Sequence, residues 1–430
     1  MRQRLSASDV FHRVVDCIVR RDGGSGNLGQ LRLRLRLPLA DRAVDDLARA
    51  WAAAGQEAWI LGASSGAGLR GAFWRMRGPA RLRCERSIAS LTALADGHLA
   101  GGLDAARGDL VRLGYASDLH DPGVVLTWNH QLADARGMQS LLATLPRLAH
   151  GARLGQRWWE GAYRSDAEVP ADPAARGRSA RAAVDVLRPL RKRGMLRATG
   201  AQRNAALPLR LASIALGDED TARCDARQRA ATGRFSELPF LLAGVAAALE
   251  SICGVGGDLL FPVAVDQRQL PDERLLANHH GFLMLGLAGG LATADLGEAG
   301  RALKSAHRTW VGTGATAKLL SAISWFPWTG SWFARYQLGF GRSGLAASCL
   351  VSNAGRTLLP ERWFGGEVQG VDHAVALPGN PGLAVLFHRD ARGLGFDVVV
   401  SGQLGERLRP TDFAQAVRHQ LIERPFPGAP

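Results

Sequence analysis

The amino-acid sequence predicts an α/β fold, because segments with the pattern of a strand alternate with segments that have the pattern of a helix. Residues 31–37 alternate leucine with arginine, which is typical of a strand with one buried face, and residues 41–54 follow as a helix. Residues 124–128 are apolar and β-branched, and the apolar side chains between residues 138 and 145 then have helical spacing. Alternation of this kind indicates mixed sheets flanked by helices.

A histidine stands at the junction between the strand 124–128 and the helix after it. His130 ends the apolar run, in a place where a side chain is held rigidly and can still face a cleft. Such a histidine is suited to act as a general base, although a lone histidine beside an apolar run is also typical of a hydrogen-bonded core residue. Asp134 lies near the start of the helix, where it can cap the first turn or pair with an arginine.

Residues 129–135, Asn-His-Gln-Leu-Ala-Asp-Ala, resemble the His-His-x-x-x-Asp-Gly motif of the chloramphenicol-acetyltransferase-like superfamily. That superfamily includes non-ribosomal peptide condensation domains, wax ester synthases and polyketide-associated acyltransferases. The resemblance implies that His130 is the catalytic base and that Asp134 is structural, paired with an arginine of the other lobe. Asn129 replaces the first histidine, and Ala135 replaces the glycine with a methyl group that we expect to narrow the route to the base.

Further segments resemble elements of the superfamily in the same order along most of the chain. The family pattern makes Arg268, in Asp-Gln-Arg, the expected partner of Asp134. It also makes Asn129, Ser352 and Asn353 candidates for contact with the substrate or with a tetrahedral oxyanion. The segments that carry this resemblance are residues 5–11, 237–250, 259–265, 266–268, 278–281, 350–356, 395–401 and 411–422.

The resemblance implies two chloramphenicol-acetyltransferase-like lobes, each a mixed sheet flanked by helices, with an active-site tunnel at their junction. We expect residues 1–165 to form the N-terminal lobe and residues 201–430 the C-terminal lobe. Residues 166–200 are expected to be a basic linker or crossover, because prolines mark a break there and the run Arg176–Arg197 follows. This run has the pattern of an amphipathic helix, which fits a solvated crossover or a docking face for carrier protein, coenzyme A or membrane.

The activity that the resemblance implies is acyl transfer from a thioester, on coenzyme A or on the phosphopantetheine of an acyl carrier protein, to a hydroxyl or amine. His130 would take the acceptor's proton, and no covalent acyl-enzyme would be needed. The acyl thioester would be a co-substrate, so we expect no permanently bound cofactor. Two alternatives stay open: a non-catalytic carrier-protein docking module of the same fold, suggested by Ala135, and a serine hydrolase using Ser64.

Three short motifs match other chemistry. Gly24–Gly29 fits the Gly-x-Gly-x-x-Gly dinucleotide fingerprint, but a strand follows it, so we expect a glycine-rich hairpin connection. Gly62–Gly66 fits the nucleophile elbow around Ser64, but poor helix formers follow it, which indicates a flexible loop. His279 and His280 would point to opposite faces of a strand, so we expect a structural or cleft-lining role and no metal site.

The composition is that of a soluble globular protein with a strongly basic balance. Of the 430 residues, 47% are hydrophobic, which is ample for a packed core, and the net charge is +14. The only lysines are Lys192, Lys304 and Lys318, so the arginine content indicates coding bias. The remaining positive surface suits the phosphates of coenzyme A, an acidic carrier protein or an anionic membrane. Nucleic acid is not an expected partner, since the sequence has no zinc-finger spacing and no RNA-binding aromatic pair.

The cysteines and the longest apolar stretch bear on location. The five cysteines are odd in number and have no Cys-x-x-Cys spacing, so neither a disulfide framework nor structural zinc is indicated and a reducing cytosol fits. The N-terminus lacks the apolar core of a signal peptide. The longest uncharged apolar stretch, residues 281–294, is shorter than the ~20 residues that a membrane span needs. We therefore expect a cytoplasmic protein without a transmembrane helix.

Residues 325–333 form the densest aromatic cluster of the chain. Glycine and proline interrupt the cluster too often for a regular core helix. The indole rings suit either a cover over the core, or the mouth of an acyl tunnel or a membrane interface. Together with the basic run Arg176–Arg197, the cluster suggests peripheral contact with the inner membrane face.

Overall fold

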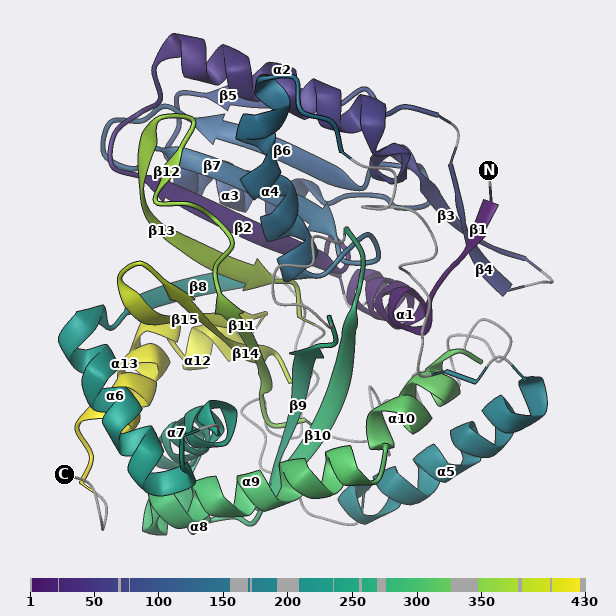
Figure 1. The fold of residues 1–430 in the computed structure, drawn as a ribbon. Coiled ribbons are helices and arrows are strands. Elements are labelled where there is room, and N and C mark those ends of the chain that lie inside the picture. The colour runs from purple at the N-terminus through teal and green to yellow at the C-terminus, as the bar shows by residue number, and fades with distance from the viewer. Residues whose placement is uncertain are drawn as a thin grey trace.

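The computed structural model describes residues 2–21, 23–68, 71–76, 78–154, 169–170, 172–191, 209–234, 236–254, 257–268, 276–325, 347–377, 381–402 and 404–425. These residues form two lobes, each built on a six-stranded sheet, with the N-terminal lobe at the top of Figure 1 and the C-terminal lobe below it. The predicted α/β class and two-lobed architecture are confirmed.

The sheet of the N-terminal lobe has the strand order β12-β13-β2-β7-β6-β5. Residues of β7 alternate between its two faces: Val124 and Leu126 belong to the same core cluster as α2 and α4, whereas Val125 packs with α3. The predicted strands at 31–37 and 124–128 and the predicted helix at 41–54 are confirmed. The elements are β2 (Leu28–Leu35), α2 (Asp41–Glu57), β5 (Cys84–Ser87), α3 (Leu91–Gly101), β6 (Val111–Ala116), β7 (Gly123–Asn129), α4 (Ala135–Ala149), β12 (Arg362–Trp363) and β13 (Gly366–Val375).

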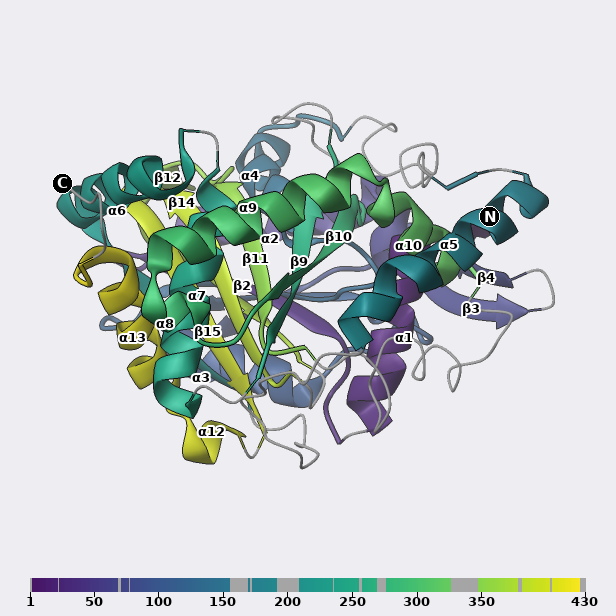
Figure 2. The same ribbon diagram turned by 90° about the horizontal axis from the view of Figure 1, so that it is seen from below.

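The sheet of the C-terminal lobe has the order β10-β9-β11-β14-β15-β8, in which β11 runs parallel to both of its neighbours. Helix α7 is buried from Pro239 to Glu250, and α9 lies beside it and against β10 (Figure 2). The elements are β8 (Leu209–Ala215), α6 (Gly217–Thr232), α7 (Glu237–Cys253), β9 (Leu259–Asp266), β10 (His280–Leu287), α8 (Leu291–Ala294), α9 (Leu296–Gly312), α10 (Ala315–Ile323), β11 (Leu350–Arg356), β14 (Leu383–Asp390), β15 (Gly393–Ser401), α12 (Leu404–Arg407) and α13 (Pro410–Ile422).

One pair of strands crosses between the lobes. β12 and β13 follow β11 in the chain, yet β13 pairs antiparallel with β2 over Val368–Val375 and so extends the N-terminal sheet. The prediction that residues 201–430 form the C-terminal lobe alone is therefore wrong for this segment. Alternation along a strand indicates which face is buried but not which sheet completes its hydrogen bonds, so the pairing of β13 with β2 depends on the assembled fold.

Helix α1 (Ala7–Arg21) lies at the junction of the two lobes and contacts α10 (Figure 1). Ser6 and Asp9 form a reciprocal capping box at its start: the Asp9 amide donates to Ser6 Oγ at 3.0 Å, and the Ser6 amide donates to Asp9 Oδ2 at 3.2 Å. The helix leads through Gly24–Gly29 into β2, so the predicted hairpin connection is wrong. A hairpin needs a strand on both sides of the loop, but the segment before this loop is a helix, whose buried side includes Val10, Val14 and Ile18.

A small sheet, β1 (Arg2–Arg4), β4 (Gly71–Arg75) and β3 (Ser64–Gly68), flanks α1. A short 3₁₀ turn (Trp59–Gly62) precedes β3, and Ser64 pairs with Arg75 in an antiparallel ladder. The predicted flexible loop is therefore wrong: the small residues of β3 form a strand because β4 pairs with them from Ser64 to Gly68. Ser64 also lacks the sharp strand-to-helix turn of a nucleophile elbow.

Helix α5 (Pro173–Arg191) contains most of the basic run Arg176–Arg197, and residues 192–197 lie outside the described residues. The helix packs on α10, burying Ala183 and Leu187, while Arg178, Arg181 and Arg188 are exposed.

Of the aromatic cluster, residues 326–333 lie outside the described part of the chain. Within that part, no single helix is long and apolar enough to cross a membrane; α6 and α7 reach that length and hydropathy only together, across a bend of 100°.

Candidate active site

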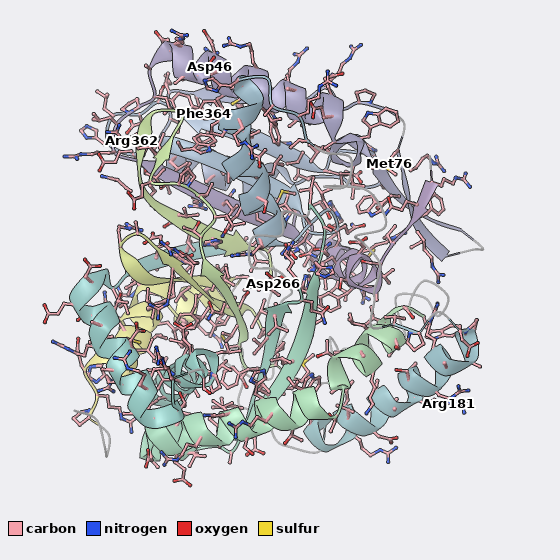
Figure 3. All side chains as sticks on the ribbon, in the orientation of Figure 1. Asp46, Met76, Arg181, Asp266, Arg362 and Phe364 are labelled. Atoms are coloured by element: carbon pink, nitrogen blue, oxygen red, sulfur yellow. The ribbon has the colours of Figure 1, made fainter. Side chains whose placement is uncertain are left out.

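A cavity of about 230 Å³ lies at the junction of the lobes. Most of its wall is apolar and comes from both lobes: α1, β7 and β13 contribute from the N-terminal side, and β9, β10, β11 and β14 contribute from the C-terminal side. Asp266, at the end of β9, marks the junction in Figure 3. The lining includes Phe11, Trp128, Leu260, Phe282, Met284 and Phe387. A cavity with such walls suits an apolar group with a few fixed polar contacts.

His130 lines this cavity directly after β7 ends. Its amide donates to the carbonyl oxygen of Asn27 at 2.8 Å, and its own carbonyl accepts from Asn278 Nδ2 at 2.9 Å. The Trp128 indole donates to the carbonyl of Ala133 at 2.8 Å and so fixes the loop on which His130 stands. Burial, and then the neighbouring His280, lower the pKa of His130 to about 4, against the opposing effect of Asp134. The imidazole is therefore neutral at neutral pH.

Asp134 has both of the roles that its position in the sequence suggested: it caps α4, and it pairs with an arginine. Its Oδ1 accepts from the Gly137 amide at 2.8 Å, and its Oδ2 accepts from the His279 amide at 2.9 Å. Arg268 binds the same carboxylate with both terminal nitrogens, at 2.9 and 3.1 Å, so the expected ion pair is present. Burial alone would raise the pKa of Asp134, but Arg268 and His280 hold it well below its usual value.

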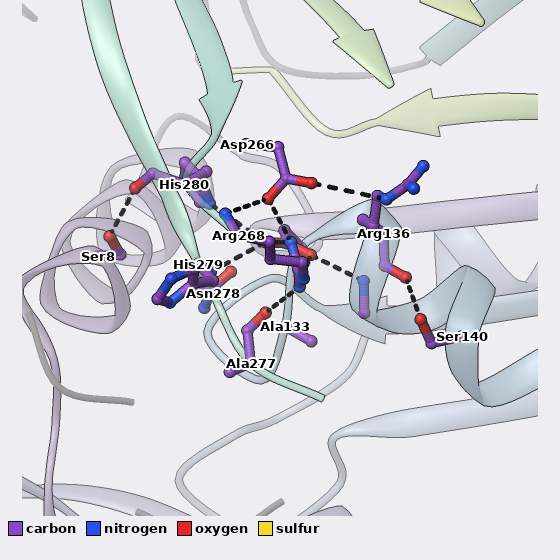
Figure 4. A network of polar contacts seen from close by, with 12 residues as sticks. Ser8, Ala133, Arg136, Ser140, Asp266, Arg268, Ala277, Asn278, His279 and His280 are labelled. Carbon is purple, nitrogen blue, oxygen red and sulfur yellow. Dashed lines mark hydrogen bonds and ion pairs between the residues drawn. The ribbon is translucent and has the colours of Figure 1, made fainter. Parts of the chain in front are cut away.

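The charged side chains around the cavity are held by one another. Arg268 also donates to Asp266 Oδ1 at 2.9 Å, and Arg136 lies 3.5 Å from the other carboxylate oxygen of Asp266 (Figure 4). Arg136 donates in addition to the carbonyl of Arg356 at 2.8 Å, which ties α4 to β11. Ala135 lines the cavity between these groups. This arrangement links the two lobes on either side of His130.

Ser352 and Asn353 were also predicted to contact the substrate. Ser352 and Asn353 line the cavity on β11, as expected of substrate contacts. Asn353 is already engaged, since its Oδ1 accepts from the Gly355 amide at 2.9 Å and its Nδ2 donates to Glu237 at 3.4 Å. Among the described residues no hydrogen bond engages the Ser352 hydroxyl, so it is the freer polar group of the two.

Asn129 does not reach the cavity, so its prediction as a substrate contact is wrong. Its side chain is fully buried and donates from Nδ2 to Asp16 Oδ1 at 3.0 Å. Side chains alternate along β7, so Trp128 and His130 face the cavity while the residue between them faces the protein interior.

Two further histidines meet His130 in the cavity. The ring of His12, from α1, stacks on the ring of His130 with centroids 4.1 Å apart and planes within 13°. His280, at the start of β10, approaches His12 with a distance of 3.1 Å between their Nε2 atoms. The cleft-lining role expected for His280 is confirmed. His12 was not predicted, because a single histidine on an amphipathic helix gives no sign of a partner more than a hundred residues away.

A second buried group, His373, His388 and Asp397, brings together three side chains that often bind metal ions. Its hydrogen bonds argue against a metal. The Leu358 amide donates to Gln139 Oε1 at 3.2 Å, which directs the Gln139 amide nitrogen to His373 Nε2 at 2.9 Å. His373 Nε2 is then the acceptor and Nδ1 carries the proton, which points to Asp397 Oδ2 at 3.3 Å. A protonated Nδ1 has no lone pair for a metal.

The fold of the chain is similar to that of solved condensation domains and of an acetyltransferase. The first condensation domain of the CDA synthetase superposes with a TM-score of 0.72 at 16% identity, over 100% of this chain and 97% of that one. The trichothecene 15-O-acetyltransferase TRI3 from Fusarium sporotrichioides gives 0.70 at 14% identity, over 98% and 96%. The condensation domain of the Monacolin K polyketide synthase MokA gives 0.64 at 14% identity, over 98% and 97%. No family model and no curated protein sequence matches the chain.

Proposed function

We propose that this protein transfers an acyl group from a thioester to a hydroxyl or amine, with His130 as the general base. The observation that carries the proposal is a neutral imidazole that faces an apolar cavity between two lobes, on a loop held by Asp134 and Arg268. The structural neighbours support it, since they include an O-acetyltransferase and a condensation domain solved with an acyl-coenzyme A.

In the proposed reaction, His130 removes the proton of the acceptor as its oxygen or nitrogen attacks the thioester carbonyl. The C–S bond breaks, and the proton returns to the leaving thiolate, so the products are an ester or amide and a free thiol. The Ser352 hydroxyl is the candidate donor to the tetrahedral oxyanion. Asp134 holds the loop and moves no proton, because Arg268 keeps its carboxylate ionised.

The lining favours an uncharged acyl chain over a charged one. The described acidic and basic groups of the lining are engaged with one another, so a charged substrate would be desolvated without a counter-charge. The donor is coenzyme A or a carrier-bound phosphopantetheine.

The test of this function is release of free thiol from acyl thioesters. Purified protein is incubated with acyl-coenzyme A of increasing chain length and with alcohols or amines, and the ester or amide is identified by mass spectrometry. We expect turnover with apolar chains and none with dicarboxylic acyl chains of equal length. Carrier-protein binding without turnover of any thioester would favour the docking-module alternative. Turnover that is abolished by Ser64→Ala and unaffected by His130→Ala would favour the hydrolase.

Peripheral membrane contact remains a proposal. The exposed arginines of α5 would meet anionic lipid, and the residues 326–333 would insert their indoles. We expect sedimentation with anionic vesicles, weaker at high salt and weaker again after Trp328→Ala with Trp332→Ala, and little binding to neutral phosphatidylcholine vesicles. Absence of binding at low salt would contradict the proposal and favour a soluble acceptor.

A further inference from the structure

Three imidazole rings from distant parts of the chain meet at one wall of the cavity. His12 comes from α1, His130 from the end of β7 and His280 from the start of β10. His12 and His280 are both at least nine-tenths buried, and a hydrogen bond crosses the lobe junction beside them: the Ser8 hydroxyl of α1 donates to the backbone carbonyl of His280 at 3.1 Å. The chemistry of His130 therefore takes place beside two other groups that can carry a proton.

The hydrogen bonds of Asn27 fix the tautomer of His12. Asn27 Nδ2 lies 3.1 Å from the backbone carbonyl of His12, which can only accept, so this atom is the amide nitrogen and not the oxygen. The same nitrogen lies 3.0 Å from His12 Nδ1, which must then be the acceptor. His12 consequently carries its proton on Nε2. A doubly protonated His12 would set an N–H group against an N–H group, so Asn27 opposes the charged form.

The proton on His12 Nε2 in turn determines which nitrogen of His280 carries a proton toward Asp134. His12 Nε2–H donates to His280 Nε2 over 3.1 Å, so His280 holds its proton on Nδ1. That atom is buried and faces Asp134 Oδ2 at 3.8 Å. These hydrogen bonds therefore assign the proton of His12 to Nε2 and the proton of His280 to Nδ1.

We infer that His12 is a positioning residue whose neutral ring stabilises the imidazolium form of His130, and that Asn27 and His280 keep it neutral. This inference rests on the proposed role of His130 as a base. A parallel ring 4.1 Å away attracts a cation through its π face. Because His130 becomes a cation only after proton transfer, the attraction is stronger in the transition state than in the resting enzyme and speeds the reaction.

A charged His12 would have the opposite effect, because two stacked cations repel. Burial, and then His130 and His280, lower the pKa of His12 well below its usual value, while Asp134 opposes them. The groups that face His130 are thus His12 from α1, His280 from β10 and Asp134 from the start of α4. Of these, only His12 lies parallel to its ring.

Nitrogen NMR of histidine-labelled protein tests the proton order without any turnover. At pH 7 we expect His12 to be the neutral Nε2–H tautomer and His280 to carry its proton on Nδ1, with assignments from His12→Phe and His280→Phe. The Nδ1–H form of His280 is the informative one, because the Nε2–H form dominates for free histidine. A charged His12 at pH 7, or the Nε2–H form of His280, would overturn the inference.

The role of the ring face is tested by a matched pair, His12→Phe and His12→Leu. Both replacements are apolar and remove the hydrogen bond to His280, but only phenylalanine keeps a π face. We expect kcat of His12→Leu to be roughly 2- to 30-fold below that of His12→Phe, with similar KM, since an attraction of this type contributes about 0.5–2 kcal/mol. The pKa of His130, followed by NMR, should be lower in His12→Leu than in His12→Phe.

Equal kcat and equal His130 pKa in the two variants would refute the role of the ring. These measurements also separate this inference from the proposed function. Protein that turns over no thioester but shows the expected tautomers and the expected difference in His130 pKa would refute the acyl-transfer reaction alone. Turnover with equal His130 pKa would refute the stacking role alone.

Discussion

Replacing His130 with alanine is expected to lower kcat/KM for thioester acyl transfer by about 10²- to 10⁴-fold, the usual contribution of a general base. The fold should persist, because the cavity already surrounds this side chain and the backbone contacts to Asn27 and Asn278 do not depend on it. Thiol release from acyl-coenzyme A measures the effect. The exposed His120 provides the matched control, and His120→Ala should keep wild-type turnover. Full activity in His130→Ala would rule out His130 as the base.

The pH profile gives a second measure of the same base. A base acts in its unprotonated form, and the pKa of His130 is lowered to about 4. The kcat/KM of the wild type should therefore stay level through the range near 6.5, where an ordinary histidine would titrate, and fall as the pH drops through about 4. An acid limb near 6.5 would mean that the base is a solvated histidine instead.

Replacing Arg268 with methionine is expected to lower the free energy of unfolding by about 3–5 kcal/mol, because it leaves the buried carboxylate of Asp134 without a cation. The side chains of the pair are 1% and 11% exposed. Asp134→Asn should cost less, since Arg268 would still bind Asp266 at 2.9 Å. Urea unfolding at pH 7 measures both losses.

A surface pair gives the control for this prediction. Arg36 and Glu367 lie 3.2 Å apart but are more than half exposed, so Arg36→Met should cost about 1 kcal/mol or less. The pKa of Asp134 is lowered in the folded protein, so the stability due to its ionised form is present above the ordinary carboxyl pKa and is lost as acid titrates it. The difference between wild type and Arg268→Met should shrink accordingly in acid. A loss for Arg268→Met no larger than for Arg36→Met would contradict a buried structural pair.

The parts of the site that could be predicted are those whose residues lie close together in sequence or match a spaced motif. His130 and Asp134 fall within one turn region, and the resemblance supplied Arg268 as the distant partner. His12 could not be found in this way, because it stacks on a loop that the chain reaches only after four strands of the N-terminal sheet, β2, β5, β6 and β7. Asn129 is adjacent to His130 in sequence but faces the protein interior, because side chains alternate along β7.

The same distinction applies to the fold. The periodicity of residues 31–37, 41–54 and 124–128 is local, so strands and helices were placed correctly there. The choice of sheet for β13 depends on which edge is open when both lobes are present, and no local pattern encodes that choice. The glycine pattern of residues 24–29 is also local, but the structure before it depends on the spacing of Val10, Val14 and Ile18, which is that of a helix.

The pairing of β13 with β2 has a consequence for biosynthesis. During translation the strands β2, β7, β6 and β5 emerge early, but the edge of β2 that β13 will cover stays open until Val375 has left the ribosome. An open edge with buried-type side chains is a template for pairing with another chain. The nascent N-terminal lobe is thus exposed to misassembly while the C-terminal lobe is still being made, and slow elongation through that interval would increase its dependence on chaperones.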